Sequence, residues 1–578
     1  MVNIKINGVE MAVEKNTTIL EAANTIGIKI PTLCHLNLHD IKFVNKLASC
    51  RVCMVEDLRN GKLLPACATP VKEGMDINTD SVKAVKARRA IVELLLSDHP
   101  NSCLTCPKNL NCQLQTLARD LNVREIPYEG EKRDLPIDDR SLSLVRDANK
   151  CILCRRCETM CNEVQTVGAL AEVGRGFNTY VGSTFDRSMF ETTCTFCGQC
   201  LSVCPTGALT EVSNVDKVWE LLRSDKIVVV QTAPAVRVAL GEEFGLEPGT
   251  VVTGKMVNAL RRLGFKKVFD TNFAADLTIM EESNEFVERL KGNGTLPILT
   301  SCCPGWVNFM EQQFSDLIDI PSSCKSPHEM FGAVAKSYLC KKMDIDPKDL
   351  VVVSVMPCIA KKFEAARPEL ESEDGNSDVD VVITTRELAS MIKEAGINFQ
   401  ELDDEDFDDP LGESTGAGAI FGATGGVIEA TVRTAYEKIT GEELGELEFT
   451  DLRGLTGIKE TEVEIDGKKI RIAVANGLGN TRRLLEKVQS GEEEIHAIEV
   501  MACPGGCIGG GGQPYHHGDL SVLKRRAEGI YSIDKGKAKR KSHENEKVQK
   551  LYDEFFGGVA SPLAIELLHT SYEKKPKL

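Results

Sequence analysis

Residues 350–358 read LVVVSVMPC, an apolar run of strand length that leads directly into a cysteine. Two other stretches have the same form, PILTSCC at 297–303 and HAIEVMAC at 496–503. Further apolar runs of strand length occur at 227–230, 379–385 and 470–475. Continuous apolar runs of this kind are typical of parallel strands covered on both faces of their sheet. The chain is therefore predicted to become α/β after about residue 215.

The cysteines that end these runs are predicted to meet. Sites in open α/β sheets gather beyond the carboxyl ends of the strands. This rule brings Cys303, Cys358 and Cys503 to one pole of the domain, with Cys507 four residues beyond the last. Cys302 precedes Cys303 directly, and neighbouring side chains of an extended run point to opposite faces.

On the N-terminal side of these strands, the spacing C-x2-C-x2-C-x3-C occurs twice, at 151–161 and 194–204. Pro205 follows the second run. This is the pattern of ferredoxins with two [4Fe–4S] clusters, in which the fourth cysteine of each run binds the other cluster. One cluster is predicted to use Cys151, Cys154, Cys157 and Cys204, and the other Cys161, Cys194, Cys197 and Cys200. Asn162, rather than proline, follows the first run.

Two further ligand sets precede these runs. The first is Cys34, Cys50, Cys53 and Cys67, which follow strand-like alternation in residues 1–16 and resemble the ligands of a [2Fe–2S] ferredoxin with a longer loop. The second is His99, Cys103, Cys106 and Cys112, after a predicted helix over 82–96. Structural zinc is an alternative for each set, and the second alone fits zinc or [4Fe–4S] equally. Its position between two iron–sulfur signals favours iron.

Composition narrows the classes of function. A chain of 578 residues is predicted to form three to five domains, and its net charge of −17 argues against nucleic-acid binding. The N-terminus has no apolar signal segment, and no run is long enough to span a membrane, so a soluble, cytoplasmic protein is expected. In such a protein the 22 cysteines are predicted to bind metal rather than to form disulfides.

Four other segments are predicted to carry no chemistry. The acidic run 401–409 lacks calcium-loop spacing and is read as a solvated loop, and the basic run 535–541 as a solvated surface. The glycine-rich stretch 416–426 fails the dinucleotide fingerprint and is assigned to close backbone approach. Residues from about 515 onward are predicted to form one or two surface helices, and Cys324 and Cys340 are taken as structural thiols.

Three motifs in order, TSCCPGW (300–306), MPCIAKK (356–362) and MACPGGCIGGGGQP (501–514), resemble the signatures of iron-only ([FeFe]) hydrogenases. The resemblance covers essentially the whole chain and is to the long, multi-cluster clostridial type. It implies a multidomain α+β and α/β protein. The expected domains are a ferredoxin-like [2Fe–2S] domain (1–80), a His/Cys3 [4Fe–4S] domain (81–140), a two-[4Fe–4S] domain (141–214), a catalytic domain (215–515) and a C-terminal helical segment (516–578).

The resemblance also implies the catalytic cofactor, the H-cluster. Its [4Fe–4S] cube would be held by Cys303, Cys358, Cys503 and Cys507, and Cys507 would bridge to a di-iron unit that carries CO, cyanide and azadithiolate. Cys302 would then be the free thiol that donates protons. A thiol with an unperturbed pKa near 8.5 can pass protons both ways near neutrality.

Other residues receive roles by resemblance. Lys361 would donate a hydrogen bond to a cyanide ligand, whereas a surface position suits its neighbour Lys362 better. Pro234, Met356 and Met501 would contact the cofactor, with core packing as the alternative for the two methionines. A proton route would run from Cys302 through Glu282, Ser322 and Glu285 to Arg289 at the surface. From the residues alone, the helix face with Glu282, Glu285 and Arg289 is interpreted as an ordinary solvated face.

The resemblance implies the reaction 2H+ + 2e− ⇌ H2, with electrons relayed through one [2Fe–2S] and the accessory [4Fe–4S] clusters. Ferredoxin, or partner subunits that bind flavin and NAD(P), would exchange these electrons. Three rivals are an iron–sulfur assembly factor on the same fold, an electron-transfer subunit similar to that of respiratory complex I, and an H2 sensor. The three C-terminal motifs, with Cys302, Glu282 and Lys361, favour the hydrogenase.

Overall fold

The computed structural model describes residues 1–41, 43, 45, 47–371 and 375–575. The chain forms two compact units. The first contains residues 1–163, 169–192 and 203–210, and the second contains residues 164–168, 193–202 and 211–578.

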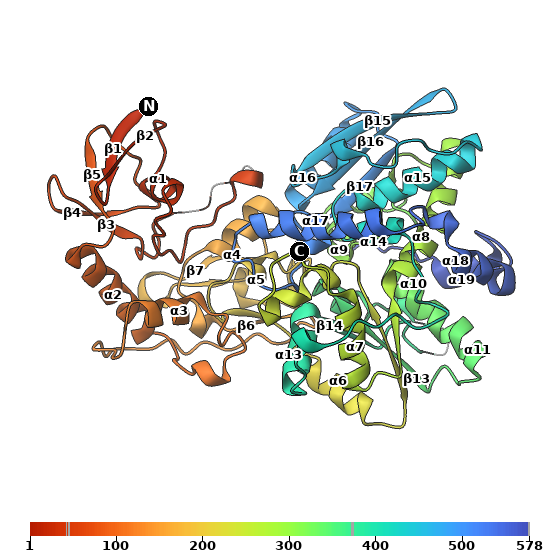
Figure 1. Ribbon diagram of the computed structural model, residues 1–578, viewed down its shortest axis with the longest axis horizontal. Helices are drawn as coiled ribbons and strands as arrows, with labels where there is room; N and C mark the ends of the chain where they lie inside the picture. Colours follow the sequence, from red (N-terminus) through yellow and green to blue (C-terminus); the bar gives the residue numbers. More distant parts are fainter. Residues whose placement is uncertain (42, 44, 46, 372–374, 576–578) are drawn as a thin grey trace. The chain divides into compact units, whose positions relative to one another are not determined.

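The first unit begins with the strand alternation expected at the N-terminus. Val2, Ile4 and Ile6 are buried, whereas the residues between them are exposed or half-buried, so the strand has one covered face. It belongs to a five-stranded sheet of order β2-β1-β5-β3-β4 (Figure 1). The strands are β1 Val2–Ile6, β2 Val9–Val13, β3 Met54–Asp57, β4 Lys62–Pro65 and β5 Met75–Asn78. Helix α1 (Ile19–Thr25) begins with a capping box made by Thr18 and Glu21.

Two helices organise the middle of this unit. Helix α2 (Val82–Ser97) confirms the helix predicted over 82–96, and Ser81 caps its first turn. It contacts α3 (Gln113–Asp120), and Val92 and Leu114 pack in a small core with Ile152. This unit also contains β6 (Leu144–Arg146), which pairs with β9 (Leu209–Glu211) at the boundary between the units, and the pair β7 (Ala171–Val173) and β8 (Tyr180–Gly182).

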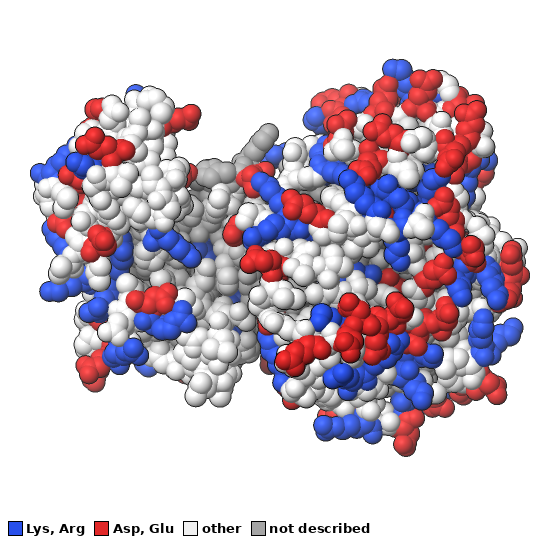
Figure 2. All heavy atoms as spheres, viewed as in Figure 1, with Lys and Arg blue, Asp and Glu red and all other residues white. Residues whose placement is uncertain are grey.

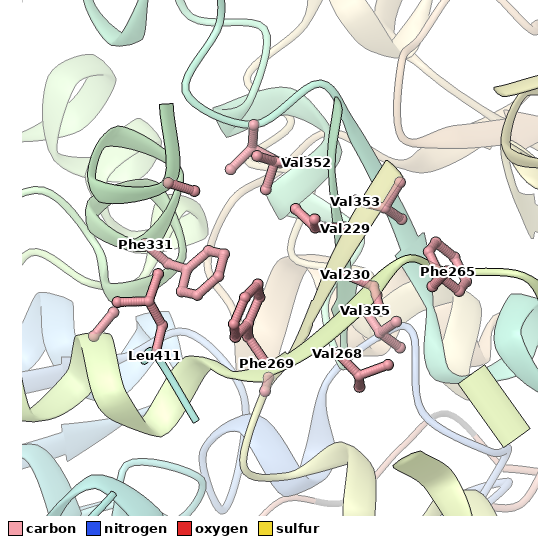
Figure 3. Packing of buried hydrophobic residues seen from close by; sticks show 14 of the residues in the cluster. Val229, Val230, Phe265, Val268, Phe269, Phe331, Val352, Val353, Val355 and Leu411 are labelled. Carbon is pink, nitrogen blue, oxygen red and sulfur yellow. The ribbon is translucent and has the colours of Figure 1, made fainter. Parts of the chain in front are cut away.

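In the second unit, the predicted apolar runs divide between two sheets rather than forming one. The first sheet is parallel, with order β11-β10-β13-β14. Its strands are β10 Ile227–Thr232, β11 Lys267–Asp270, β13 Leu350–Met356 and β14 Val381–Thr384. All seven residues of β13 are buried, as expected for a strand covered on both faces. Figure 3 shows valines of β10 and β13 between Phe331 and Leu411 on one side and Phe265 on the other.

The second sheet is mixed, with order β12-β17-β16-β15. Strands β12 (Ile298–Leu299), β17 (Ala497–Met501) and β16 (Lys468–Asn476) are parallel to one another, whereas β15 (Ile458–Ile465) pairs with β16 as an antiparallel hairpin. The hairpin alternates in burial because one of its faces is solvated. Figure 1 shows α15 (Gly426–Thr440) and α16 (Leu478–Ser490) beside this sheet.

Helices connect and cover these strands. The ones that position the site are α8 Thr271–Leu290, α9 Pro304–Gln313, α10 Pro327–Val334, α12 Ala360–Glu364 and α14 Gly416–Ile420. Close backbone approach in the glycine-rich stretch is confirmed. A Cβ on Gly418 would lie 2.6 Å from the Asn272 carbonyl oxygen, and one on Gly425 would lie 2.1 Å from that of Leu452.

The prediction of one or two surface helices after residue 515 is wrong. Helices α17 (Ser521–Gly536), α18 (Glu546–Leu551) and α19 (Pro562–Leu568) follow one another, and each contributes fully buried side chains. Val548, Leu551 and Leu568 join the same core as the parallel sheet. The C-terminal segment therefore covers apolar surface of the α/β unit, and its helices bury their own apolar side chains against that surface.

The basic run 535–541 is also not simply solvated. Lys541 is buried and pairs with Glu437 at 2.7 Å, and Arg540 pairs with Asp534. The acidic run 401–409 is a loop as predicted, apart from a short turn at Phe399–Glu401, and its Asp408 accepts hydrogen bonds from the Val268 amide and Lys267. On the face seen in Figure 2, lysine and arginine are interspersed with aspartate and glutamate.

Candidate functional site

The ends of three strands bring the predicted cysteines together. Strand β13 ends at Met356, two residues before Cys358, and β17 ends at Met501, two residues before Cys503. Strand β12 pairs in parallel with β17, so the chain after β12 runs beside the chain after β17. The Ala502 amide accordingly donates to Cys303 Sγ at 3.4 Å. The parallel pairing therefore explains why cysteines about 200 positions apart become neighbours.

These cysteines line a cavity with a volume of about 80 Å³. Nine residues predicted for the site line it: Pro234, Cys302, Cys303, Met356, Cys358, Lys361, Met501, Cys503 and Cys507. The rest of its wall is mainly apolar and includes Ala233, Ala275 and Phe421. The structure therefore brings together all the residues proposed to hold or contact the cofactor.

The donor set fits an iron–sulfur group. Burial raises the pKa of Cys303, Cys358 and Cys503, and raises that of Cys507 to about 12. Thiols in such surroundings become thiolates only beside a strong positive charge, which a metal supplies. Four sulfur donors in one apolar cavity match the ligand set of a [4Fe–4S] cube.

Cys302 lines the same cavity, but the pKa of its thiol differs from the ordinary value. Burial, followed by the charge of Glu282, raises the pKa of Cys302 well above its usual range. The sequence-based assumption of an unperturbed thiol is therefore wrong for this protein. The cause is desolvation, which disfavours the thiolate. A neutral thiol is a proton donor in its resting form.

Lys361 extends into the cavity from α12. Its Nζ donates to the Cys302 carbonyl oxygen at 3.2 Å and to Glu364 at 2.6 Å. Although burial lowers the pKa of Lys361, the Glu364 carboxylate raises it overall. Lys362 is not at the surface as predicted: it is buried and pairs with Glu387 at 2.8 Å. Both lysines can be buried because each forms an ion pair with a buried carboxylate.

The predicted proton route lies along α8. The Ser322 hydroxyl donates to Glu285 Oε2 at 2.8 Å, and Arg289 binds Glu285 Oε1 at 2.6 Å. Glu282 is buried, and burial together with the charges of Glu285 and Glu499 raises its pKa to about 8. The alternative of a solvated helix face is therefore wrong. A carboxyl that titrates near neutrality suits proton exchange.

Arg289 is not at the surface as predicted. Its guanidinium donates to the carbonyl oxygens of Ile320 at 2.6 Å and Pro321 at 2.9 Å, and the residue is only 9% exposed. The five donors of a guanidinium favour such carbonyl-rich surroundings. Arg289 holds Glu285 in place from inside the protein.

A buried cluster beside the cavity was missed by the sequence analysis. His328, the second residue of α10, lines the cavity. Its Nε2 lies 2.9 Å from Glu364 and 2.5 Å from Glu329, and its Nδ1 lies 3.2 Å from Ser354 Oγ. The stretch SPHEMFG (326–332) carries one histidine beside one glutamate. Such a pair gives no spacing signal, because its partner Glu364 is distant in sequence.

The first unit contains further cysteine-lined sites. Cys53 Sγ and Cys67 Sγ lie 3.3 Å apart, and both residues are buried with Cys34 and Cys50. Another pocket is lined by Cys151, Cys154, Cys157 and Cys204, the set expected for one ferredoxin cluster. Of the second ferredoxin set, Cys161 belongs to the first unit and Cys194, Cys197 and Cys200 to the second, so that set stays a prediction from spacing.

A third pocket of the first unit is lined by His99, Cys103, Cys106 and Cys112. Among the residues the structure describes, buried His99 Nε2 has no hydrogen-bond partner. A Cβ on Gly207 would lie 2.7 Å from Cys106 Sγ, so only glycine fits against this sulfur. An unpaired imidazole nitrogen among three thiols suits a metal, with iron or zinc both compatible.

None of the helices within the described ranges combines the length and apolarity needed to cross a membrane.

Comparison with protein-family models gives five matches along the chain. Residues 226–511 match the C-terminal domain of the iron only hydrogenase large subunit, and residues 520–575 match the iron hydrogenase small subunit. Residues 1–82 match a 2Fe-2S cluster binding domain, residues 88–127 match the iron–sulfur binding region of NADH-ubiquinone oxidoreductase G, and residues 150–208 match a 4Fe-4S dicluster domain. These matches confirm the predicted kinds of domain and their order.

Curated proteins match over the whole chain. The NADP-reducing hydrogenase subunit HndD of Solidesulfovibrio fructosivorans is 56% identical and covers 100% of both chains. Iron hydrogenase 1 of Clostridium pasteurianum is 43% identical over 99% of this chain and 100% of its own. Among solved structures, a variant of [FeFe]-hydrogenase HydA1 from Chlamydomonas reinhardtii matches with a TM-score of 0.58 and 42% identity, covering 63% of this chain and 99% of that chain.

Proposed function

Because the chain belongs to the iron-only ([FeFe]) hydrogenase family, an oxidoreductase family acting on H2, we propose that it performs 2H+ + 2e− ⇌ H2 in the cavity at the ends of β12, β13 and β17. The observation that carries the proposal is the convergence of five cysteines and Lys361 on this apolar cavity. When bound, the H-cluster supplies an open metal site at which the H–H bond is made or broken.

Four of the five cysteines hold the cofactor. Cys303, Cys358, Cys503 and Cys507 would hold its [4Fe–4S] cube, and Cys507 would also contact the di-iron unit. Cys303 is kept in place by the Ala502 amide, a hydrogen bond that favours the thiolate. Lys361 is held by Glu364 and the Cys302 carbonyl oxygen, and its remaining N–H would be free to donate to a cyanide of the di-iron unit.

Proton transfer is the task of the other side chains. Cys302 holds the proton that is given to, or taken from, the cofactor. Glu282 exchanges that proton with the thiol, and Ser322 links it to Glu285. Apolar neighbours such as Met356, Met501 and Pro234 limit water around the cofactor.

Electrons travel through the clusters of the N-terminal domains. This proposal assigns one [2Fe–2S] cluster, the His99 [4Fe–4S] cluster and two ferredoxin-type [4Fe–4S] clusters to the ligand sets predicted above. The domain limits 1–80, 81–140, 141–214, 215–515 and 516–578 are part of the same proposal. The matched 2Fe-2S and 4Fe-4S domain models support the kinds of cluster.

The relative HndD is a subunit of an NADP-reducing hydrogenase. By this similarity, we propose that flavin- and NAD(P)-binding partner subunits exchange electrons with this chain, with ferredoxin as a further carrier. A flavin is required because nicotinamides transfer hydride, whereas clusters transfer single electrons.

The test is anaerobic maturation of the chain with a [4Fe–4S] cube and a synthetic di-iron compound. We expect CO and cyanide infrared bands on the protein, and H2 evolution from a reduced one-electron dye. Cys507→Ala should lose both signals. Cys340→Ala is the matched control, because Cys340 is a cysteine of the same unit that is buried in the hydrophobic core and does not line the cavity. Full H2 evolution by Cys507→Ala would disprove the assignment of the cavity.

A further inference from the structure

The outer end of the proton route contacts an imidazole from the C-terminal segment. His569, directly after α19, places Nδ1 2.7 Å from the hydroxyl of Ser323. The same hydroxyl lies 3.4 Å from Glu285 Oε2, and the Ser323 amide donates to that oxygen at 3.2 Å. Ser322, on the inner side, donates to the same oxygen at 2.8 Å. Glu285 Oε2 therefore contacts two hydroxyls: that of Ser322 on the inner route and that of Ser323, which also contacts His569.

Arg289 is a poor final member of a proton route. A guanidinium stays protonated throughout the pH range of proteins, so it cannot release a proton to water and take it back. Its hydrogen bonds to Glu285 and to buried carbonyl oxygens also hold it inside the protein. These contacts suit a residue that positions Glu285. Exchange with water requires a neighbouring group that titrates.

His569 is built into its position. Its Nε2 lies 3.2 Å from Glu281 Oε2, and Tyr552 donates to Glu281 Oε1 at 2.6 Å. Glu281 also accepts from the Ala560 amide at 3.0 Å. Because Glu281 binds one ring nitrogen, the other is aimed at Ser323. The His569 side chain nevertheless keeps 13% exposure to solvent.

The charged and titratable neighbours of the imidazole come from several elements. Glu281 and Glu285 face it from α8, and Cys324 pairs with His569 through an isolated backbone bridge. The groups that act on these neighbours are Tyr552 and Lys438 on Glu281, Arg289 on Glu285, and Tyr572, which donates to the Ser322 carbonyl oxygen.

The rate at which water delivers protons to Glu285 limits the proton route at neutral pH. Encounters limited by diffusion occur at about 10⁹–10¹⁰ M⁻¹ s⁻¹, so the ~10⁻⁷ M hydronium of neutral water reaches a single carboxylate only on the order of 10² to 10³ times per second. Enzyme turnover reaches about 10³ s⁻¹. Direct delivery to Glu285 is therefore barely sufficient at neutral pH. An imidazole, which also takes protons from buffer molecules, removes this limit.

We propose that His569 exchanges protons between solvent and Glu285 through the hydroxyl of Ser323, a step that rests on the proposed function. In the inward direction, the Nδ1–H bond of protonated His569 breaks and that proton binds Ser323 Oγ. The hydroxyl proton of Ser323 passes to Glu285 Oε2, so imidazolium becomes imidazole and the carboxylate becomes a carboxylic acid. Ser322 then carries the route inward from the same oxygen. The outward direction is the reverse.

The experiment uses the matured enzyme with saturating reduced dye and measures H2 evolution from about pH 5.5 to pH 8.5. His569→Gln should evolve H2 at nearly the wild-type rate at the acidic end, where hydronium is abundant. Its rate should fall to about one fifth of wild type near pH 8, because the direct supply declines tenfold per pH unit. Ser323→Ala should show the same profile, and the double variant should be no worse than either single one. Added free imidazole should restore His569→Gln.

His543→Gln is the matched control. His543 lies in the same unit, is partly exposed and also pairs with a glutamate, Glu437 at 2.9 Å. Within the part of the chain that the structure describes, it forms no hydrogen bond with Ser323 or Glu285. Its pH profile should equal that of wild type. Melting temperature and the electron paramagnetic resonance of the clusters report whether each variant is folded and loaded.

The outcomes separate the two proposals. A loss in His569→Gln that is equal at all pH values and not restored by imidazole would indicate a structural anchor and overturn the relay. An unchanged profile in both His569→Gln and Ser323→Ala would show that Glu285, whose side chain is 19% exposed, exchanges directly with water. Glu282→Gln tests the proposed function itself: it should be nearly inactive at every pH, and full activity there would refute the inner route.

Discussion

At the scale of single residues, Cys302 and Cys303 show how position divides two identical side chains. Both line the cavity, but Cys303 Sγ is held by the Ala502 amide, which favours a thiolate ligand. Burial and the negative charge of Glu282 raise the pKa of Cys302, which favours the protonated thiol. In the proposed roles, ligand and proton donor are therefore distinguished by hydrogen bonding and charge rather than by residue type.

Cys302→Ala should keep the cube and lose turnover. We expect cube loading, followed by electron paramagnetic resonance, to match wild type, because Cys303 supplies the ligand. H2 evolution should fall by about 100-fold or more, because the variant has no proton donor at the cavity. Cys302→Ser should also be poor, since a hydroxyl releases its proton far less readily than a thiol. Turnover close to wild type in Cys302→Ala would remove the proton-donor role.

At the scale of elements, helix α8 joins the catalytic cavity to the C-terminal segment. Asp276 accepts from the amide and hydroxyl of Thr415 at 2.9 and 2.6 Å, from Ser542 at 2.8 Å and from Asn545 at 2.9 Å. One buried carboxylate thus ties α8 to the start of α14 and to the turn before α18. Five residues further along, Glu281 binds Tyr552 and His569.

Asp276→Asn should weaken this junction. The amide group replaces an acceptor oxygen by a donor that faces other donors, so the free energy of unfolding should fall by about 2–4 kcal/mol. Thermal unfolding of the loaded protein measures the change. Asp316→Asn is the control, because the Asp316 side chain is 86% exposed and lies 3.7 Å from Lys574. Equal melting temperatures for the two variants would contradict the junction.

At the scale of the whole molecule, the proposed function assigns electron transfer mainly to the first unit and the reaction of H2 to the second. The first unit contains three of the predicted accessory ligand sets in full, and the second contains the cavity. The cluster assignments predict the number of iron atoms per chain, because each cluster type has a fixed iron content.

A fully loaded chain should hold about 20 iron atoms: one [2Fe–2S], four [4Fe–4S] and the di-iron unit. Elemental analysis of the anaerobically purified, matured protein measures this. One equivalent of zinc with about 16 iron atoms would show that the His99 site is a zinc site. His99→Ala should then change the zinc content rather than the iron content.

The matured chain alone should oxidise H2 with a one-electron dye or ferredoxin but not with NAD+ or NADP+, since hydride transfer needs a flavin. Activity with the nucleotide should appear when a flavin-bearing partner is added. Replacing Cys50 and Cys53 by serine should impair the partner-linked activity and spare the dye-linked activity. NAD+ or NADP+ reduction by the pure chain without flavin would overturn this division.

The sequence by itself determined the domain order, the cluster-binding motifs and most strands of the α/β unit. These features depend on local spacing, because the distances between ligand residues and the length of an apolar run involve residues close together in the chain. The resemblance of three short motifs to a known family supplied the site residues, and the parallel ends of β12, β13 and β17 explain their convergence.

Only the tertiary structure decided which polar residues are buried. Lys362, Lys541 and Arg289 were predicted to lie at the surface, but all three are buried. Distant carboxylates pair with the two lysines, and the carbonyl oxygen of Ile320 accepts a hydrogen bond from Arg289. The surroundings of His328 and His569 were likewise not predictable from the sequence, because Glu364 and Glu281, which contact them, lie on other elements. Burial and ion pairing depend on contacts between segments far apart in the chain, and the desolvation that sets proton affinity follows from those contacts. Local sequence carries no record of them.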